Sequence, residues 1–142
     1  MKTHRRFILR VLAVLLGAGA PSARAAEGWA DPGLPVKDGL ELWLDGSRLN
    51  AALAARGAPA LRNDDGISLF PDASGRRRDL AQPARALAPL YQADLLPGKP
   101  LAVAHFDGAD DHLLRSGIGA AFEEATAFVV AAPHSNAGGF RA

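Results

Sequence analysis

The sequence predicts an all-β domain that is rich in loops and carries one short helix. Glycine and proline contribute 15 and 10 of the 142 residues, which is above the average share of about 12%. Turn signals recur roughly every ten residues between positions 58 and 100, with short apolar pieces between them. Leucines at alternate positions of GLELWLD add the two-residue period of a strand with one buried face.

The first 25 residues have the features of a signal peptide. A basic start is followed by the apolar stretch VLAVLLGAGA, and Ala23-Arg24-Ala25 offers the small-x-small pattern of a cleavage site. This apolar stretch of 10 residues is too short to span a bilayer as a helix, which needs about 20. We therefore expect residues 1–25 to be removed and the protein to be periplasmic or extracellular. Arg5-Arg6 with its neighbours resembles the twin-arginine export pattern, and an ordinary secretory signal remains the alternative.

Removal of the signal peptide reverses the net charge. The whole chain has 16 basic and 15 acidic residues. Five of the basic residues and none of the acidic ones lie in positions 1–25, which leaves 11 against 15, a net charge of −4. A chain with a net negative charge lacks the basic surface that binds nucleic acid or anionic lipid. We expect neither nucleic-acid binding nor membrane insertion of the mature chain, and we interpret Arg76-Arg77-Arg78 as a solvated loop tip.

The sequence contains no cysteine. Disulfides, a thiol-linked lipid anchor and zinc held by thiolates are therefore excluded. An exported domain without disulfides depends on its apolar core alone for stability.

The mature chain divides into an extended leader, residues 26–36, and one domain, residues 37–142. Residues 39–45 form the predicted strand, which ends at Asp45-Gly46. A short helix is expected near residues 48–56, with Ser47 as its N-terminal cap and Gly57 in the left-handed position after its end.

Four further elements are expected beyond the turn-rich middle of the chain. Residues 101–107 form a predicted strand, Asp107-Gly108 a turn, and residues 112–116 the returning strand of a hairpin. A short helix is one interpretation of residues 120–124. The continuous apolar run at 126–132 predicts a fully buried strand.

Asp107, Asp110 and Asp111 form the densest acidic cluster of the chain. Their spacing does not fit an EF-hand loop, which ends in a glutamate at its twelfth position. Asp-Gly is a strong turn signal, and aspartate side chains hydrogen-bond the backbone of turns. We favour turn chemistry, and a calcium site is the alternative because all-oxygen coordination suits that ion.

No other group of side chains forms a catalytic pattern. Glu123 and Glu124 are adjacent, so they cannot face one another across a cleft as a glycosidase pair does. His105 and His112 could approach across the predicted hairpin, but two imidazoles alone are a weak metal site. The remaining candidates lack a nucleophile elbow or a partner, and they are Ser68, Ser74, Ser116 and His134. We assign no catalytic, cofactor or metal residue and predict that the chain is not an enzyme.

The aromatic residues Trp29, Trp43 and Tyr91 have two interpretations. Exposed aromatic rings stack on sugars, and Trp43 falls on the polar side of the alternation in its predicted strand. Large aromatic side chains are more often buried, so we favour burial beneath a covering loop.

Several segments together resemble the laminin-G-like, concanavalin A-like lectin/glucanase modules of exported bacterial proteins. Residues 39–47 are similar to the opening strand G-L-x-L-W-L-D-A-S, and residues 72–82 to the loop D-x-S-G-x-x-x-D-x-x-Q. Pro89-Leu90-Tyr91 resembles the P-x-Y segment, and residues 98–113 resemble G-x-P-x-x-x-F-D-G-x-D-D-x-L. Phe128-Val129-Val130 falls where the next strand, F-x-V-V, is expected.

The resemblance covers about residues 36–132 and implies a jelly-roll β-sandwich. It also implies that the F-D-G-x-D-D segment is chiefly structural, although some relatives bind calcium or glycans in edge loops. The glucanase signature E-x-D-x-x-E is absent. Such modules are nearly twice as long, so we expect half a sandwich that needs a second half-domain or a partner.

Together these patterns predict an exported, non-catalytic, lectin-like module that binds a carbohydrate or a surface protein. The alternative is a structural accessory domain, or a fragment, of a larger exported enzyme with no ligand of its own.

Overall fold

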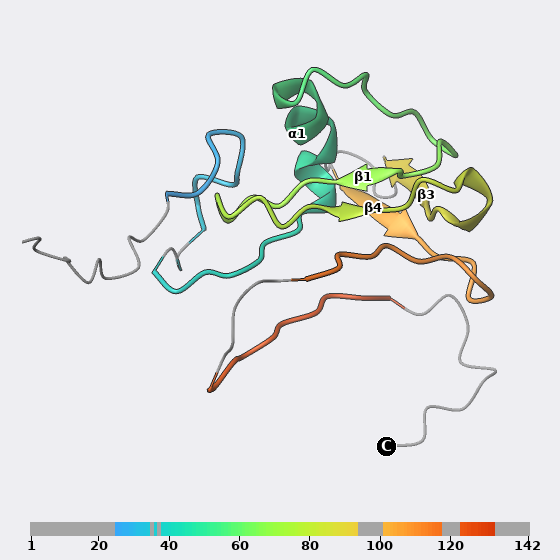
Figure 1. Ribbon diagram of the computed structural model, residues 1–142. Coiled ribbons are helices and arrows are strands. Elements are labelled where there is room, and N and C mark those ends of the chain that lie inside the picture. The colour runs from blue at the N-terminus through green and yellow to red at the C-terminus, as the bar shows by residue number, and fades with distance from the viewer. Residues whose placement is uncertain (1–24, 35, 37, 94–100, 118–122, 133–142) are drawn as a thin grey trace, which may run out of the picture.

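The described part of the chain is β-rich and contains one short α-helix (Figure 1). The computed structural model describes residues 25–34, 36, 38–93, 101–117 and 123–132. The elements, in chain order, are η1 (Gly46–Arg48), α1 (Leu49–Ala55), β1 (Leu69–Phe70), β2 (Leu80–Ala81), η2 (Arg85–Leu87), β3 (Leu90–Ala93) and β4 (Ala102–His105). Strands that outnumber a single helix confirm the β-rich class predicted from the turn signals.

The strands form two small antiparallel sheets. β1 pairs with β2, with Leu69 opposite Ala81. β3 pairs with β4, with Leu90 opposite His105. An isolated bridge extends each sheet. Gly66 bridges Leu90 of β3, and Leu114 bridges Ala81 of β2.

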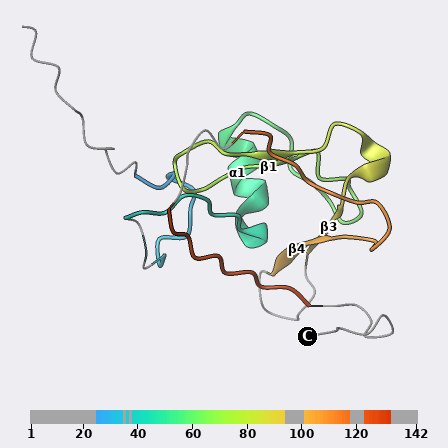
Figure 2. The same cartoon turned by 60° about the horizontal axis from the view of Figure 1, so that its bottom comes forward.

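One small core joins the helix to both sheets. α1 contributes two leucines, and β1, β3 and β4 each contribute one side chain. The buried residues of this core are Leu49, Leu53, Ile67, Phe70, Tyr91 and Ala102. In Figures 1 and 2, α1 lies beside the two sheets, so burial of its apolar stripe is what holds this seven-residue helix in place.

The helix agrees with the sequence prediction, but its start is built differently. The predicted range of 48–56 corresponds to α1 preceded by the single turn η1. Ser47 is not the cap: the Asp45 side chain accepts hydrogen bonds from the backbone N–H and the hydroxyl group of Ser47, at 2.9 and 2.6 Å. Gly57 has φ +72°, the left-handed conformation predicted for the residue that follows the helix.

The first predicted strand, residues 39–45, is wrong as a strand. The segment pairs with none of the described strands, and Leu42 is exposed although the alternation predicts its burial. The reason is that the backbone groups of this segment bond to the loop at 72–78, and mostly to its side chains. Side-chain donors and acceptors can satisfy an extended backbone without forming a sheet ladder.

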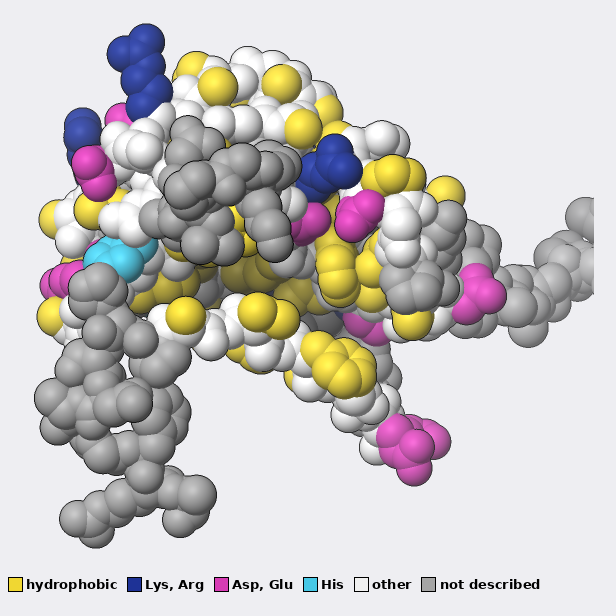
Figure 3. Space-filling view, turned by 180° about the vertical axis from the view of Figure 1, so that it is seen from behind, with side chains coloured by type: hydrophobic (Ala, Val, Ile, Leu, Met, Phe, Trp, Pro, Cys, Tyr) yellow, Lys and Arg dark blue, Asp and Glu magenta, His cyan; other side chains and the backbone are white. Residues whose placement is uncertain are grey.

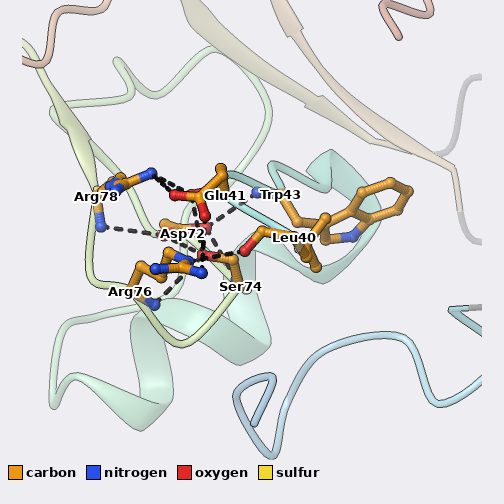
Figure 4. A network of polar contacts seen from close by, with 7 residues as sticks. All are labelled: Leu40, Glu41, Trp43, Asp72, Ser74, Arg76 and Arg78. Carbon is orange, nitrogen blue, oxygen red and sulfur yellow. Dashed lines mark hydrogen bonds and ion pairs between the residues drawn. The ribbon is translucent and has the colours of Figure 1, made fainter. Parts of the chain in front are cut away.

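Asp72 is the centre of that loop and is fully buried. Its Oδ1 accepts the backbone N–H groups of Trp43, at 3.0 Å, and of Ser74, at 2.9 Å. Its Oδ2 accepts the Ser74 hydroxyl group at 2.7 Å and the backbone N–H of Arg78 at 3.0 Å. Figure 4 shows these groups converging from two separate segments on one carboxyl group.

The arginine run is not the solvated loop tip that the sequence suggested, because only Arg77 is exposed. Arg76 donates from Nε to the Leu40 carbonyl oxygen at 2.9 Å and forms an ion pair with Glu41 at 2.7 Å. Arg78 donates to the carbonyl oxygen and to the carboxylate of Glu41. The two guanidinium groups fold back because Glu41 and the free carbonyl groups of its segment give them partners.

Asp79 extends the network to the helix. Its Oδ1 accepts the backbone N–H of Asp72 at 2.9 Å and lies 3.4 Å from a guanidinium nitrogen of Arg56. The same nitrogen lies 3.9 Å from Glu27. The loop therefore connects the N-terminal segment, the end of α1 and residues 40–43.

The predicted hairpin at 101–116 is only half correct. β4 confirms the strand expected at 101–107, within narrower bounds. The return, residues 112–116, does not pair with β4: Leu114 bridges Ala81 of β2, with N···O distances of 3.0 and 3.1 Å. A loop wider than a two-residue hairpin turn carries the chain from one sheet to the other.

The buried strand predicted at 126–132 is also wrong. Phe128, Val129 and Val130 are 92%, 84% and 103% exposed, and no strand is assigned to them. The apolar pattern predicts burial, but the described residues supply no second layer over this segment. Most of the helix expected at 120–124 lies outside the described residues.

The N-terminal segment is more ordered than an extended leader. Within residues 26–36, Ala30 and Leu34 are buried in hydrogen-bonded turns, and the Glu27 N–H donates to the Ala73 carbonyl oxygen at 3.0 Å. The predicted signal peptide, apart from Ala25, lies outside the described residues. Within the part of the chain that is described, no helix is both long and apolar enough to cross a membrane.

We expect Asp72→Ala to destabilise the fold by about 3 kcal/mol or more, because buried N–H donors would lose their acceptor. Urea unfolding followed by circular dichroism measures this change. Asp38→Ala is the control, since this exposed residue should change stability by less than about 0.5 kcal/mol. Equal stability of the two variants would contradict the central role of Asp72.

We expect Gly46→Ala to cost about 1–3 kcal/mol, because a methyl group there would collide with the backbone carbonyl of Ala102 in β4. Gly28→Ala is the matched control, since its added methyl group meets nothing within 4 Å. Thermal melts of both variants test the prediction, and a Gly46→Ala protein as stable as Gly28→Ala would refute the close approach.

Candidate functional site

The structure brings Asp107, Asp110 and Asp111 together in one turn. Each offers a carboxylate oxygen, and these atoms lie within 4.8 Å of one another. Oxygen atoms at this spacing fit the calcium alternative in composition. The hydrogen bonds that the Asp107 and Asp111 carboxylates accept, however, show that these side chains hold the turn together.

Asp107 organises this turn. Its Oδ1 accepts the backbone N–H groups of Ala109, Asp110 and Asp111, at 2.8, 3.3 and 3.4 Å. In return, Asp111 Oδ2 accepts the Asp107 N–H at 2.9 Å. Gly108 has φ +78°, whereas Asp107 does not have a positive φ, so the turn is held by side chains and is not a two-residue hairpin turn. These bonds support the turn interpretation made from the sequence.

The backbone N–H of Ala109 holds the pKa of Asp107 below its ordinary value, and the N–H groups of Asp111 and Asp110 act in the same direction. Hydrogen bonds to a charged carboxylate stabilise that form against protonation. The Asp107 carboxylate therefore stays charged, and keeps accepting the hydrogen bonds of the turn, at a lower pH than an ordinary aspartate would.

Both ring nitrogens of the candidate histidine His112 are engaged. His112 contacts Gln82, with 2.7 Å between its Nε2 and the amide nitrogen, and its Nδ1 lies 2.9 Å from the Asp110 carbonyl oxygen. Gln82 is buried, and its Oε1 accepts the Ala84 N–H at 3.0 Å. His112 thus anchors the turn to the segment after β2 through these two contacts. His134 lies outside the described residues.

The serine and glutamate candidates lie in different surroundings. Ser74 is buried against Asp72, and Ser68 and Ser116 are exposed. Glu123 and Glu124 are exposed neighbours at a bend of the chain.

The three aromatic residues differ in exposure. Tyr91 is buried, as the favoured interpretation predicts, and its hydroxyl lies 3.3 Å from Asn50 Nδ2. Trp29 and Trp43 are half-buried, and the indole N–H of each is buried without a hydrogen-bond partner. Neither indole therefore directs its N–H donor to solvent.

A recess between α1 and β3 was not predicted. It has a volume of about 350 Å³. Its lining residues are Asn50, Leu61, Arg62, Asn63, Tyr91 and Ala93. No single motif joins them, because they come from three segments that only the fold brings together.

Hydrogen bonds fix the walls of this recess. The Asn50 amide both donates to and accepts from the backbone of Leu61, at 3.0 and 2.8 Å. Asn63 Oδ1 accepts the Ala93 N–H at 2.7 Å. Asn63 and the exposed Arg62, whose side chains carry amide and guanidinium donors, are among its lining residues.

Comparison with known proteins gave no match: no family model, no curated protein and no solved structure is similar to this chain.

We expect Asp107→Asn to reduce the acid dependence of stability. Because the pKa of Asp107 is lowered in the folded state, its contribution is complete above the pKa of an unfolded aspartate and is lost as the pH falls through the folded value. Asparagine keeps an oxygen acceptor for the turn but does not titrate in this range. Urea unfolding from neutral to strongly acidic pH tests this, with Asp38→Asn as control. Identical pH profiles of the Asp107→Asn variant and the unaltered protein would contradict it.

Proposed function

We propose that this chain is an exported, non-catalytic, lectin-like module that binds a carbohydrate or a surface protein outside the cytoplasm. The observation that carries the proposal is the recess between α1 and β3, with Asn50, Arg62, Asn63 and Tyr91 among its lining residues. Ligand sites are concave and place a few fixed polar groups against the ligand. A small recess with several hydrogen-bonding groups suits the hydroxyl groups of a sugar better than an apolar ligand.

The proposal includes a jelly-roll β-sandwich that a partner or a second half-domain completes. Two small antiparallel sheets sharing one core support the β-rich part of this arrangement. The ordered motifs between residues 36 and 132 supply the resemblance to laminin-G-like modules. The exposed apolar segment at 126–132 supports the need for a covering layer.

A purely structural accessory domain is the second candidate, and one observation favours it. Asp72 and Asp107, each in a segment of the resemblance, both accept backbone N–H groups of their own loops. Carboxylates committed in this way stabilise turns and are not free to act on a substrate, which also supports a non-catalytic role.

Glycan binding should depend on the recess. We expect Arg62→Ala to weaken binding to an immobilised glycan panel about tenfold, the loss of one charge-assisted hydrogen bond. Arg115→Ala is the control, because Arg115 is exposed outside the recess. Added millimolar calcium should leave binding unchanged, since Asp107 is already engaged by backbone N–H groups.

Three results would point elsewhere. If the Trp43→Ala variant loses glycan binding and the Arg62→Ala variant keeps it, the binding site is at the indole of Trp43 and not at the recess. Dependence on calcium together with loss in Asp110→Ala would move it to the acidic turn. No binding to any glycan would favour the structural accessory domain.

A further inference from the structure

The amide side chains that line the recess between α1 and β3 use their oxygen atoms to hold its walls together. Asn50 Oδ1 accepts the Leu61 N–H at 2.8 Å, and the Asn50 amide nitrogen donates to the Leu61 carbonyl oxygen at 3.0 Å. Asn63 Oδ1 accepts the Ala93 N–H at 2.7 Å. Both side-chain carbonyl oxygens of the lining are therefore engaged by backbone N–H groups of the chain itself.

Two lining residues keep donors that the fold does not use. The bond from Ala93 fixes the orientation of the Asn63 amide, so the amide nitrogen of Asn63 is directed away from that bond. Arg62 is exposed, and only its backbone N–H has a hydrogen-bond partner. Among the described residues, neither the Asn63 amide nitrogen nor the Arg62 guanidinium group has a hydrogen-bond or ion-pair partner. The groups that these two residues offer to a ligand are thus donors, and one of them is a permanent cation.

Two aspartates follow these residues in the chain, but neither lines the recess. Asp65 Oδ2 accepts the Arg62 backbone N–H at 2.7 Å, so that carboxylate is already engaged within its loop. Asp64 is exposed and has φ +69°. Neither carboxylate forms an ion pair with the Arg62 guanidinium group.

The basic side chains visible in Figure 3 are interspersed with acidic ones. Charges of opposite sign that lie close together offset one another, and salt screens what remains of their field. An anion on this protein would therefore be recognised by a cation placed at a site, and not by a broad basic surface.

We propose that the ligand of the recess is an acidic sugar, whose carboxylate or sulfate group accepts hydrogen bonds from the Arg62 guanidinium group and the Asn63 amide nitrogen. The planar guanidinium group donates two parallel hydrogen bonds to such an oxyanion, and charge-assisted bonds are about twice as strong as neutral ones. This inference rests on the proposed function, because it names the class of glycan that the same recess binds.

Matched pairs of sugars, titrated calorimetrically into the full chain, test the inference. One pair is an oligogalacturonate and its methyl ester, and the other is a sulfated galactose oligomer and its unsulfated form. We expect the charged member of at least one pair to bind about tenfold or more tightly than its neutral partner, because only the charged member forms the charge-assisted bonds. The pair that shows this preference identifies the oxyanion.

Asn63→Asp tests the proposed donor directly. One carboxylate oxygen can still accept the Ala93 N–H, while the other replaces the amide nitrogen by a negative charge. We expect this variant to bind the charged sugar about tenfold or more weakly. Thermal melts followed by circular dichroism show whether the variant keeps the fold.

Asp64→Asn should act in the opposite direction. It removes a negative charge beside Arg62, and asparagine tolerates the left-handed backbone of Asp64. We expect it to raise the affinity for the charged sugar about twofold. Asp38→Asn is the matched control, since it removes an exposed carboxylate outside the recess and should leave the affinity unchanged.

The outcomes separate this inference from the proposed function. Equal binding of the charged and neutral members of both pairs would overturn the inference and leave glycan binding intact. Binding of a charged sugar that Asn63→Asp does not weaken would also overturn it, because the oxyanion would then lie elsewhere. Absence of binding to every sugar would overturn the proposed function together with the inference.

Discussion

The carboxyl group of Asp72 is the constraint on which most of this structure depends. It is buried, so each of its oxygen atoms needs donors, and the surrounding chain has to supply them. Two of these donors come from Ser74, one from Arg78 and one from Trp43, a residue 29 positions earlier. Placing Trp43 against the loop fixes the path of the segment that leads into α1.

This arrangement gives a physical meaning to the spacing D-x-S-G-x-x-x-D-x-x-Q. Asp72 and Ser74 close the loop, and Asp79 accepts the Asp72 N–H and reaches Arg56 at the end of α1. Gln82 then binds both Ala84 and His112, which anchors the acidic turn. Each polar position of the motif is therefore a tether between segments, and none is left as a free reactive group.

The sequence predicted the features that depend on local chemistry. Leu49, Ala52 and Leu53 at helical spacing mark α1, and Gly57 marks its end, because propensity and backbone freedom are properties of the residues themselves. The carboxylates of the acidic turn behave as aspartate side chains do in loops elsewhere. These features require no knowledge of distant partners.

The features that depend on a distant partner were missed. Alternation at Leu40, Leu42 and Leu44 predicts a ladder, but the neighbouring loop offers mostly side chains to that backbone. The return after Asp111 has a strand-like composition, and composition cannot decide between β4 and β2 as its partner. The recess lining is likewise a product of packing, since Asn50 and Asn63 carry no signal of proximity in the sequence.

The exposed segment at 126–132 shows how far hydrophobicity can be used in such a prediction. An apolar run indicates that the chain gains free energy when the run is buried, but it does not indicate which surface will cover it. The described body has one small core and two-stranded sheets, and an isolated two-stranded sheet is marginally stable in water. A fold with little buried area gains most from any additional strand. The apolar residues that were wrongly predicted as buried are therefore those that would gain most from a covering layer.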